Sequence, residues 1–309
     1  MRWEDFRQSD NVEDYRGQDT SGGSPGGGII PGGPGGLGIG GVLVLGLLGW
    51  ALGIDPRILI SGAEVLTGGQ SQYQQEASRT RQLPRGQTPT DEQGRFVRAV
   101  LGDTEDQWKI LFEKAGKRYE EPKLRIFSGQ MPSACGRAQS AMGPFYCPND
   151  KSIYLDTSFF RDLEVRFRGC ETGSRACRFA QAYVIAHEVG HHVQFILGIL
   201  PQVQNMQRGM DKTQANRMQV RVELQADCFA GVWAYHSNQK WRTIDDNDIA
   251  AALRTAAAIG DDRLQKQSQG TVVPESFTHG SSAQRQRWFS TGFKSGSIAA
   301  CNTFKTDDV

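Results

Sequence analysis

The spacing of apolar residues after residue 93 predicts a domain built mainly from helices. Two short runs, KLRIF at residues 123–127 and SIYL at residues 152–155, are instead typical of strands. Residues 96–101 and 108–115 have helical spacing, with Thr104 and Gln107 placed as a capping box between the two stretches. Further stretches with helical spacing are residues 157–167, 181–197, 223–236 and 243–260, with a last helix beginning near residue 282. Many helices and a few strands predict an α+β fold, mainly helical with a small β-sheet.

One uncharged apolar run, LGIGGVLVLGLLGWALGI at residues 37–54, has about the length that spans a bilayer core. It predicts a single transmembrane helix, and a buried helix of a soluble domain is the alternative. A cleaved signal peptide fits poorly, because a long segment containing many acids precedes the run. The pairs Gly36/Gly40 and Gly49/Gly53 have G-x-x-x-G spacing, which would suit a homo-oligomer.

This apolar run and the composition of the segments around it divide the chain into four parts. Residues 1–36 are polar and then rich in glycine and proline, which predicts a disordered tail. Residues 37–54 form the expected transmembrane helix, and residues 55–92, polar and glutamine-rich, form a juxtamembrane linker. Residues 93–309 then make up the folded domain.

Composition excludes one class of partner. Of 309 residues, 38% are hydrophobic and 22% are charged, and the formal net charge is +1. Such a balance provides no electrostatic field that attracts nucleic acid. The sequence also carries no nucleic-acid-binding or phosphate-loop motif, so we expect no nucleic-acid partner.

All six cysteines follow the apolar run. An even number of cysteines in an anchored protein favours disulfides in an oxidising compartment. A structural zinc site is the alternative, although no C-x-x-C occurs. Sequence alone leaves the pairing open, but the spacing favours three pairs: Cys135–Cys147, Cys170–Cys177 and Cys228–Cys301. We therefore expect the N-terminus in the cytoplasm and the folded domain outside it.

The helix predicted at residues 181–197 carries candidate zinc ligands. In QAYVIAHEVGHHVQFIL, His187 and His191 stand one turn apart with Glu188 beside the first, the H-E-x-x-H arrangement. Residues four apart share a helix face, so both imidazoles can bind one Zn²⁺ at roughly 2.0–2.1 Å. Glu188, about 100° further round, stays near the metal without displacing its water. Two core histidines on a buried helix are the alternative.

An acidic pair on the next long helical stretch supports the zinc interpretation. Glu223, in ELQADCFAGVWAYH, can complete a His₂Glu ligand set and leave the fourth position to water. Asp227, one turn further on, would accept the free ring N–H of a ligating histidine and fix its tautomer. A solvated helix face is the alternative, but the apolar neighbours of these acids imply a buried side.

A later loop, FTHGSS, offers a group for the transition state. Zinc peptidases need a hydrogen-bond donor for the oxyanion besides the metal. His279 is our candidate for this catalytic role, with Tyr183 and Tyr154 as rivals, and a purely structural loop histidine is the alternative. Arg285, on the helix that follows, would anchor either a substrate or the region of Asp227.

Over nearly its whole length the chain resembles the bacterial neutral zinc metallopeptidase family, a membrane-anchored group. The matching stretches are MRWEDFRQSDNVEDYRG, the glycine-rich tail with the apolar run, GPFYCP, IYLD, AYVIAHEVGHHVQ, ELQADCFAGVWA and FTHGSSAQR. The resemblance implies a zincin-like metallopeptidase domain with His187, His191 and Glu223 as ligands and Glu188 as base. The E-x-x-x-D and THGSS segments are also similar to those of membrane zinc endopeptidases of the heat-shock and CAAX-processing type. Those relatives span the membrane several times, whereas this chain has one candidate span.

Residues and resemblance together predict a membrane-anchored, zinc-dependent metalloendopeptidase of the bacterial inner membrane, with its catalytic domain in the periplasm or otherwise outside the cytoplasm. A polypeptide substrate would be cut by a zinc-activated water with Glu188 as general base. An exposed edge of the small sheet could bind an extended peptide, unless the strands merely cover the H-E-x-x-H helix. Two alternatives are an anchored binding or assembly protein stabilised by zinc, and a zinc hydrolase of a non-peptide amide or ester.

Overall fold

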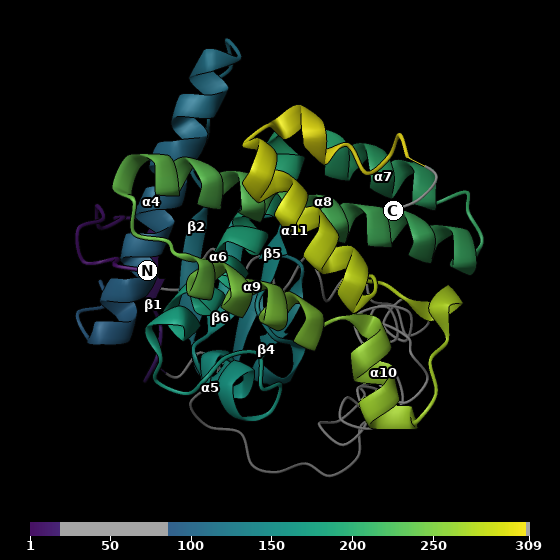
Figure 1. The fold of residues 1–309 in the computed structure, drawn as a ribbon, viewed down its shortest axis with the longest axis horizontal. Coiled ribbons are helices and arrows are strands. Elements are labelled where there is room, and N and C mark those ends of the chain that lie inside the picture. Colours follow the sequence, from purple (N-terminus) through teal and green to yellow (C-terminus); the bar gives the residue numbers. More distant parts are fainter. Residues whose placement is uncertain (19–85, 307–309) are drawn as a thin grey trace, which may run out of the picture.

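The computed structural model describes residues 1–18 and 86–306 (Figure 1). Within them a four-stranded sheet, in the order β1-β2-β6-β5, and a two-stranded hairpin, β3-β4, are combined with long helices. The expected α+β fold, mainly helical with a small sheet, is therefore confirmed. The strands are β1 (Val12–Asp14), β2 (Lys123–Phe127), β3 (Gln130–Ser133), β4 (Gly136–Gln139), β5 (Phe145–Cys147) and β6 (Ser152–Asp156). The α-helices are α4 (Glu92–Lys114), α5 (Ser158–Val165), α6 (Arg175–Ile196), α7 (Ile199–Gln207), α8 (Lys212–Trp241), α9 (Asp246–Ala258), α10 (Asp261–Gln269) and α11 (Ser282–Ser295). Short 3₁₀ turns are η1 (Ser140–Met142), η2 (Pro274–Ser276) and η3 (Ile298–Cys301).

The two strands expected from the sequence are β2 and β6, which lie side by side in parallel with Leu124 opposite Ile153. Alternate residues point to opposite faces of a strand. Leu124 and Leu155 accordingly belong to the main core, whereas Tyr154 belongs to a smaller cluster behind the sheet. β5 pairs with β6 antiparallel, with Phe145 opposite Tyr154, and forms one edge of the sheet.

Helix α6 is the central element of the fold, in contact with α4, α8, α9 and β5 (Figure 1). It begins after Ser174, whose side chain accepts the N–H of Cys177, a favourable cap for the first turn. It ends at Ile196, and Gly198, two residues further on, adopts a left-handed conformation with φ of 78°. Most residues of α6 are buried, as expected for a helix that has packing partners on every side.

The N-terminal residues are part of the folded domain, which corrects the expected disordered tail for residues 1–18. The Trp3 ring packs edge-on against Phe96, with centroids 5.6 Å apart, and Phe6 lies 5.3 Å from Trp241. These aromatic residues are isolated in a polar segment, so they produce neither helical nor strand periodicity. Their packing could not be recognised from the pattern, because it depends on partners far away in the chain.

Two further features hold this segment on α4. Gly102 permits a close crossing, since a Cβ there would lie 2.2 Å from the backbone oxygen of Arg7. The buried Glu105 carboxylate accepts hydrogen bonds from Arg7 at 2.6 Å and from the Ser9 hydroxyl at 2.7 Å. The domain therefore includes both described segments, residues 1–18 and 86–306.

The expected disulfide pairing is confirmed. The bonds are Cys135–Cys147, Cys170–Cys177 and Cys228–Cys301. The last of them attaches η3, near the end of the chain, to the middle of α8.

The expected transmembrane helix at residues 37–54 lies outside the described residues, as do half of the predicted tail and most of the predicted linker. None of the helices within residues 1–18 and 86–306 combines the length and apolar character needed to cross a bilayer.

The two described segments, residues 1–18 and 86–306, are nevertheless joined to each other by backbone hydrogen bonds. β1 pairs in parallel with β2, and Asp14 and Gln87 exchange two backbone hydrogen bonds of 2.7 and 3.0 Å. A single crossing between residues 18 and 86 would separate these partners by the thickness of a bilayer. The expected orientation, with the N-terminus in the cytoplasm and the domain outside, is therefore incompatible with this sheet. Both described segments must lie on the same side of any membrane.

We predict that cysteines introduced at positions 10 and 165 lie on the same side of the membrane. Both positions are accessible, because the Asp10 side chain is 95% exposed and Val165 is 61% exposed. In intact spheroplasts the two variants should react to the same extent with a membrane-impermeant maleimide. Permeabilised cells give the full signal, and the native cysteines contribute little because all are in disulfides. Labelling of one position and protection of the other would contradict the pairing of β1 with β2.

Candidate metal centre

Three side chains suited to binding a metal converge from two helices. His187 and His191 come from α6 and Glu223 from α8, and their ligand atoms all lie within 4.8 Å of one another. Glu223 Oε2 is 3.2 Å from His187 Nε2 and 3.5 Å from His191 Nε2. Two ligands of a tetrahedral Zn²⁺ are roughly 3.3 Å apart when each bond is about 2.0–2.1 Å long. The donor types and the two distances from Glu223 therefore fit zinc, and the structure brings together all three sequence-predicted ligands.

A close helix crossing makes this convergence possible. Gly190 stands between the two histidines and faces Ala226, which stands between Glu223 and Asp227. A Cβ at position 190 would lie 2.9 Å from the Ala226 backbone oxygen and 3.1 Å from its Cα. Because glycine has no side chain, α8 can approach α6 closely enough for the Glu223 carboxylate to reach both rings.

Asp227 is fully buried behind His187, as the sequence suggested. Its Oδ1 lies 2.8 Å from His187 Nδ1 and accepts the Tyr183 hydroxyl at 2.5 Å. Arg285 donates to both oxygens of the carboxylate, at 2.8 and 2.9 Å. Burial alone would raise the pKa of Asp227, but Arg285 and His187 outweigh burial and hold that pKa at about 2. An ionised Asp227 keeps the proton of His187 on Nδ1, which leaves Nε2 to face Glu223.

The other ligands are oriented by glutamines that the sequence analysis missed. Gln194 Oε1 lies 2.9 Å from His191 Nδ1, and its amide donates to the Val222 backbone oxygen at 2.8 Å. Gln219 donates to Glu223 Oε1 at 2.9 Å, so Oε2 is the oxygen nearest the two rings. A polar residue three positions after His191, within a buried stretch, was the available signal for Gln194.

A cleft of about 560 Å³ opens beside the three candidate ligands, which all line it together with Glu188. Glu188 is 7% exposed. Among the described residues no side chain or backbone group forms a hydrogen bond or ion pair with its carboxylate. The edge strand β5 also contributes to the wall of the cleft, through Phe145 and Tyr146.

His279 lies on the same cleft wall, with 30% of its side chain exposed. Its rivals are placed differently. The Tyr183 hydroxyl is bonded to Asp227 and Arg285, and the Tyr154 hydroxyl is bonded to Asp150, away from the cleft. Arg285 contacts Asp227, which is one of the two roles expected for it.

In the metal-free cluster a proton balances the buried negative charge. Burial alone would lower the pKa of His187, but Asp227 and Glu223 outweigh burial and raise it to about 10. Burial would raise the pKa of Glu223, yet the two histidines hold it well below its usual range. A proton on His187 Nε2 therefore occupies the place that a cation would take.

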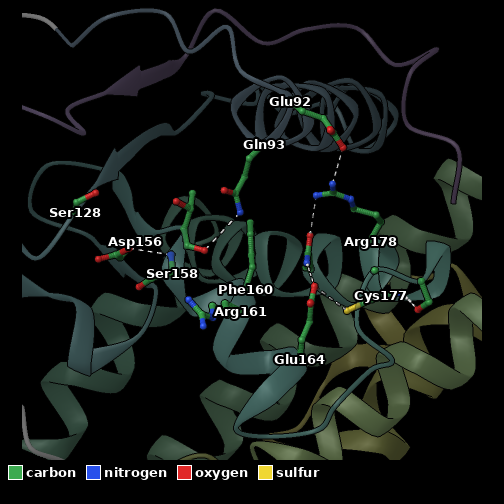
Figure 2. A pocket seen from close by; sticks show the side chains of 14 residues that line it. Glu92, Gln93, Ser128, Asp156, Ser158, Phe160, Arg161, Glu164, Cys177 and Arg178 are labelled. Atoms are coloured by element: carbon green, nitrogen blue, oxygen red, sulfur yellow. Dashed lines mark hydrogen bonds and ion pairs between the residues drawn. The ribbon is translucent and has the colours of Figure 1, made fainter.

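A second cavity, of about 540 Å³, lies at the N-terminal end of α6 and has a different character (Figure 2). Its polar groups are engaged with one another. Arg178 pairs with Glu92 at 2.6 Å, and Gln181 donates to Glu164 at 3.0 Å. No histidine lines it, so the metal chemistry of the described residues belongs to the cleft beside His187.

Two crossed helices bring two histidines and two glutamates to one cleft, and one of these glutamates, Glu188, has no partner among the described residues. This arrangement is typical of the class of H-E-x-x-H metalloproteins. The chain belongs to the family described as "Putative neutral zinc metallopeptidase", whose model matches residues 1–304. The family implies zinc as the metal.

The chain is similar to the protein YpfJ of Escherichia coli, with 48% identity over 98% of this chain and 99% of YpfJ. It is also similar to a protein of Mycobacterium bovis, Mb2605, with 43% identity over 70% of this chain and 73% of that relative. No solved structure gives a significant match.

We predict that Gly190→Ala lowers zinc affinity by roughly 10–100-fold, the usual effect of disturbing groups that support metal ligands. The added methyl would push α8 away from α6 and withdraw Glu223 from the rings. Competition with a chelating dye measures the affinity. Gly209→Ala is the control, because its Cβ would meet nothing closer than 4.0 Å. Equal zinc affinity in the two variants would refute the role of the crossing.

We predict that the His187 ring stays doubly protonated in the metal-free protein at pH 8 and becomes neutral when zinc is added. Because its pKa is raised to about 10, the stabilisation from this proton is complete below about pH 6.5 and is lost as pH rises toward 10. Nitrogen-15 shifts of the histidine rings report protonation. His192 is an internal control, since burial lowers its pKa to about 4 and keeps it neutral throughout. A neutral His187 at pH 8 without metal would contradict this account.

Proposed function

We propose that this protein is a zinc-dependent metalloendopeptidase that hydrolyses peptide bonds in polypeptide substrates. The observation that carries the proposal is the position of Glu188, a carboxylate without a partner among the described residues, in the same cleft as His187, His191 and Glu223. Membership of a zinc metallopeptidase family supports the reaction class.

Each residue has a separate task in this mechanism. His187, His191 and Glu223 would hold the ion, and Asp227 and Gln194 keep the two imidazoles turned toward it. Bound zinc would polarise the scissile carbonyl and acidify an attacking water. Glu188 accepts the proton of that water and passes it to the leaving amine nitrogen.

His279 is the proposed donor to the developing oxyanion. It shares the cleft with Glu188 and Glu223, and its ring is partly exposed there. A preorganised donor at this position stabilises charge that appears only in the transition state. The geometry supports His279 over Tyr183, whose hydroxyl is already bonded to Asp227 and Arg285.

A polypeptide substrate is supported by the edge of the sheet. Among the described residues strand β5 is paired on one side only, with β6, and the segment from Ser140 to Tyr146 lines the cleft. An extended peptide can add to such an edge through backbone hydrogen bonds that do not depend on its sequence. This arrangement favours a peptide over a small non-peptide amide, which needs no strand beside it.

We also propose that the domain works at the bacterial inner membrane, outside the cytoplasm. Three disulfides are typical of an oxidising compartment. The apolar run at residues 37–54 would contact the membrane, with residues 1–18 and 86–306 both on the same side of it.

We predict that Glu188→Gln keeps zinc but loses cleavage activity by about 10²–10⁴-fold, the usual contribution of a general base. Zinc content is measured on the purified protein, and turnover with a denatured protein and a peptide library read by mass spectrometry. Glu113→Gln is the matched control, since Glu113 is exposed on α4. A Glu188→Gln variant that cleaves like wild type would remove Glu188 as base. Zinc binding without turnover in wild type would favour the binding-protein alternative.

A further inference from the structure

The loop that carries His279 is held by one buried carboxylate. Asp261, the first residue of α10, accepts three backbone N–H groups on Oδ2, from Thr278 at 2.7 Å, His279 at 2.6 Å and Gly280 at 3.0 Å. Its own N–H donates to the Gly280 backbone oxygen at 2.9 Å. Three successive N–H groups can point at one oxygen in only a narrow range of loop conformations, so Asp261 fixes the backbone around His279.

The second oxygen of the same carboxylate contacts the ring. Asp261 Oδ1 lies 3.3 Å from His279 Nδ1, and the Thr278 hydroxyl lies 3.1 Å from the same nitrogen. The two nitrogens of an imidazole face different directions, so a ring held at Nδ1 has Nε2 turned away from Asp261. The ring itself is part of the cleft wall that also contains Glu188 and Glu223.

Asp261 remains a charged acceptor in this setting. It is 9% exposed, and burial alone would raise its pKa. The hydrogen bond and charge of His279, with the backbone N–H groups, outweigh burial and lower that pKa. A hydrogen bond between a ring N–H and an ionised carboxylate is stronger than one between neutral groups.

We propose that Asp261 is a positioning residue for His279, holding loop and ring so that Nε2 faces the substrate oxygen in the cleft. The proposal rests on the proposed peptidase function, because it assigns Asp261 a role through the oxyanion donor. Asp261 does not touch the substrate, and its effect passes through His279.

The chain supplies a matched control in the next residue. Asp262 Oδ1 accepts the Ser282 N–H at 2.7 Å and the Ser282 hydroxyl at 2.8 Å. It therefore supports the same loop and the start of α11, but these hydrogen bonds go to Ser282 and not to the His279 ring. A purely structural role for the acids at positions 261 and 262 would give the two substitutions similar effects.

The test compares Asp261→Asn, Asp262→Asn, His279→Gln and the double variant Asp261→Asn/His279→Gln in the zinc-loaded full chain. We expect Asp261→Asn to lower kcat by about 10–100-fold, the cost of misplacing a catalytic group, with little change in KM or zinc content. In the double variant kcat should match that of His279→Gln alone, because the two residues act as one unit. Asp262→Asn should lower the thermal midpoint without this loss of kcat.

A second measurement does not depend on turnover. Nitrogen-15 spectra of the His279 ring, assigned with His279→Gln, should shift in Asp261→Asn and stay unchanged in Asp262→Asn. If Asp261→Asn does not fold, Asp261→Glu keeps the charge and moves it, and should show the same ring shift with partial activity.

The outcomes separate the two proposals. If wild type cleaves and Asp261→Asn has normal kcat, the positioning role is overturned and the peptidase function stands. The same conclusion follows if the loss of kcat in the double variant is the product of the losses in the two single variants. If wild type shows no turnover, the peptidase function fails, and the ring spectrum decides whether Asp261 orients His279. An unshifted ring in Asp261→Asn would overturn the positioning role in that case too.

Discussion

The close crossing of α6 and α8 at Gly190 is the constraint on which the candidate metal centre depends. Two histidines one turn apart occur on one helix face by geometry alone, but the third ligand has to come from another element. Ala226 meets Gly190 almost backbone to backbone, and Glu223 and Asp227 flank it on α8. Glu223 therefore lies beside the Nε2 atoms of both rings, whereas Asp227 contacts Nδ1 of His187.

Charge explains why such a cluster can be buried. A buried carboxylate is costly unless a positive group compensates it. Arg285 from α11 compensates Asp227 through two hydrogen bonds, and Gly292 lets α11 come close to α8, where a Cβ would lie 1.9 Å from the Cys228 backbone oxygen. Among the described residues no arginine forms an ion pair with Glu223, so a proton on His187 or a cation compensates this carboxylate. The site is therefore built around a positive charge at its centre.

Features that depend on the spacing of residues along the chain were predicted correctly from the sequence. His187 and His191 follow from a four-residue interval, strands β2 and β6 from short apolar runs, and the disulfides from the intervals between cysteines. Glu223 was found because its helix has an apolar side that had to be buried. These features are local, or they repeat with the period of a helix or strand.

Features that depend on single distant partners were missed or misjudged. Trp3 and Phe6 are scattered in a polar segment, yet they pack on Phe96 and Trp241. Asp261 resembles an ordinary surface residue in the sequence, because nothing in the pattern indicates that a ring lies beside it. The same limitation affected the membrane topology, since a hydropathy pattern marks an apolar run without showing that the flanks pair in one sheet.

The carboxylates around the cleft show how environment assigns different tasks to one functional group. Asp227 is fixed by Arg285 and cannot exchange protons near neutral pH, with a pKa of about 2, which suits a group that only orients a ring. Asp261 is saturated with backbone N–H groups, so it too serves as a fixed acceptor. A general base must instead gain and lose a proton in each cycle, so a fixed arginine or a set of N–H donors would hinder it. Of these buried acids, Glu188 alone has no such partner among the described residues, and it faces the cleft where a substrate would bind.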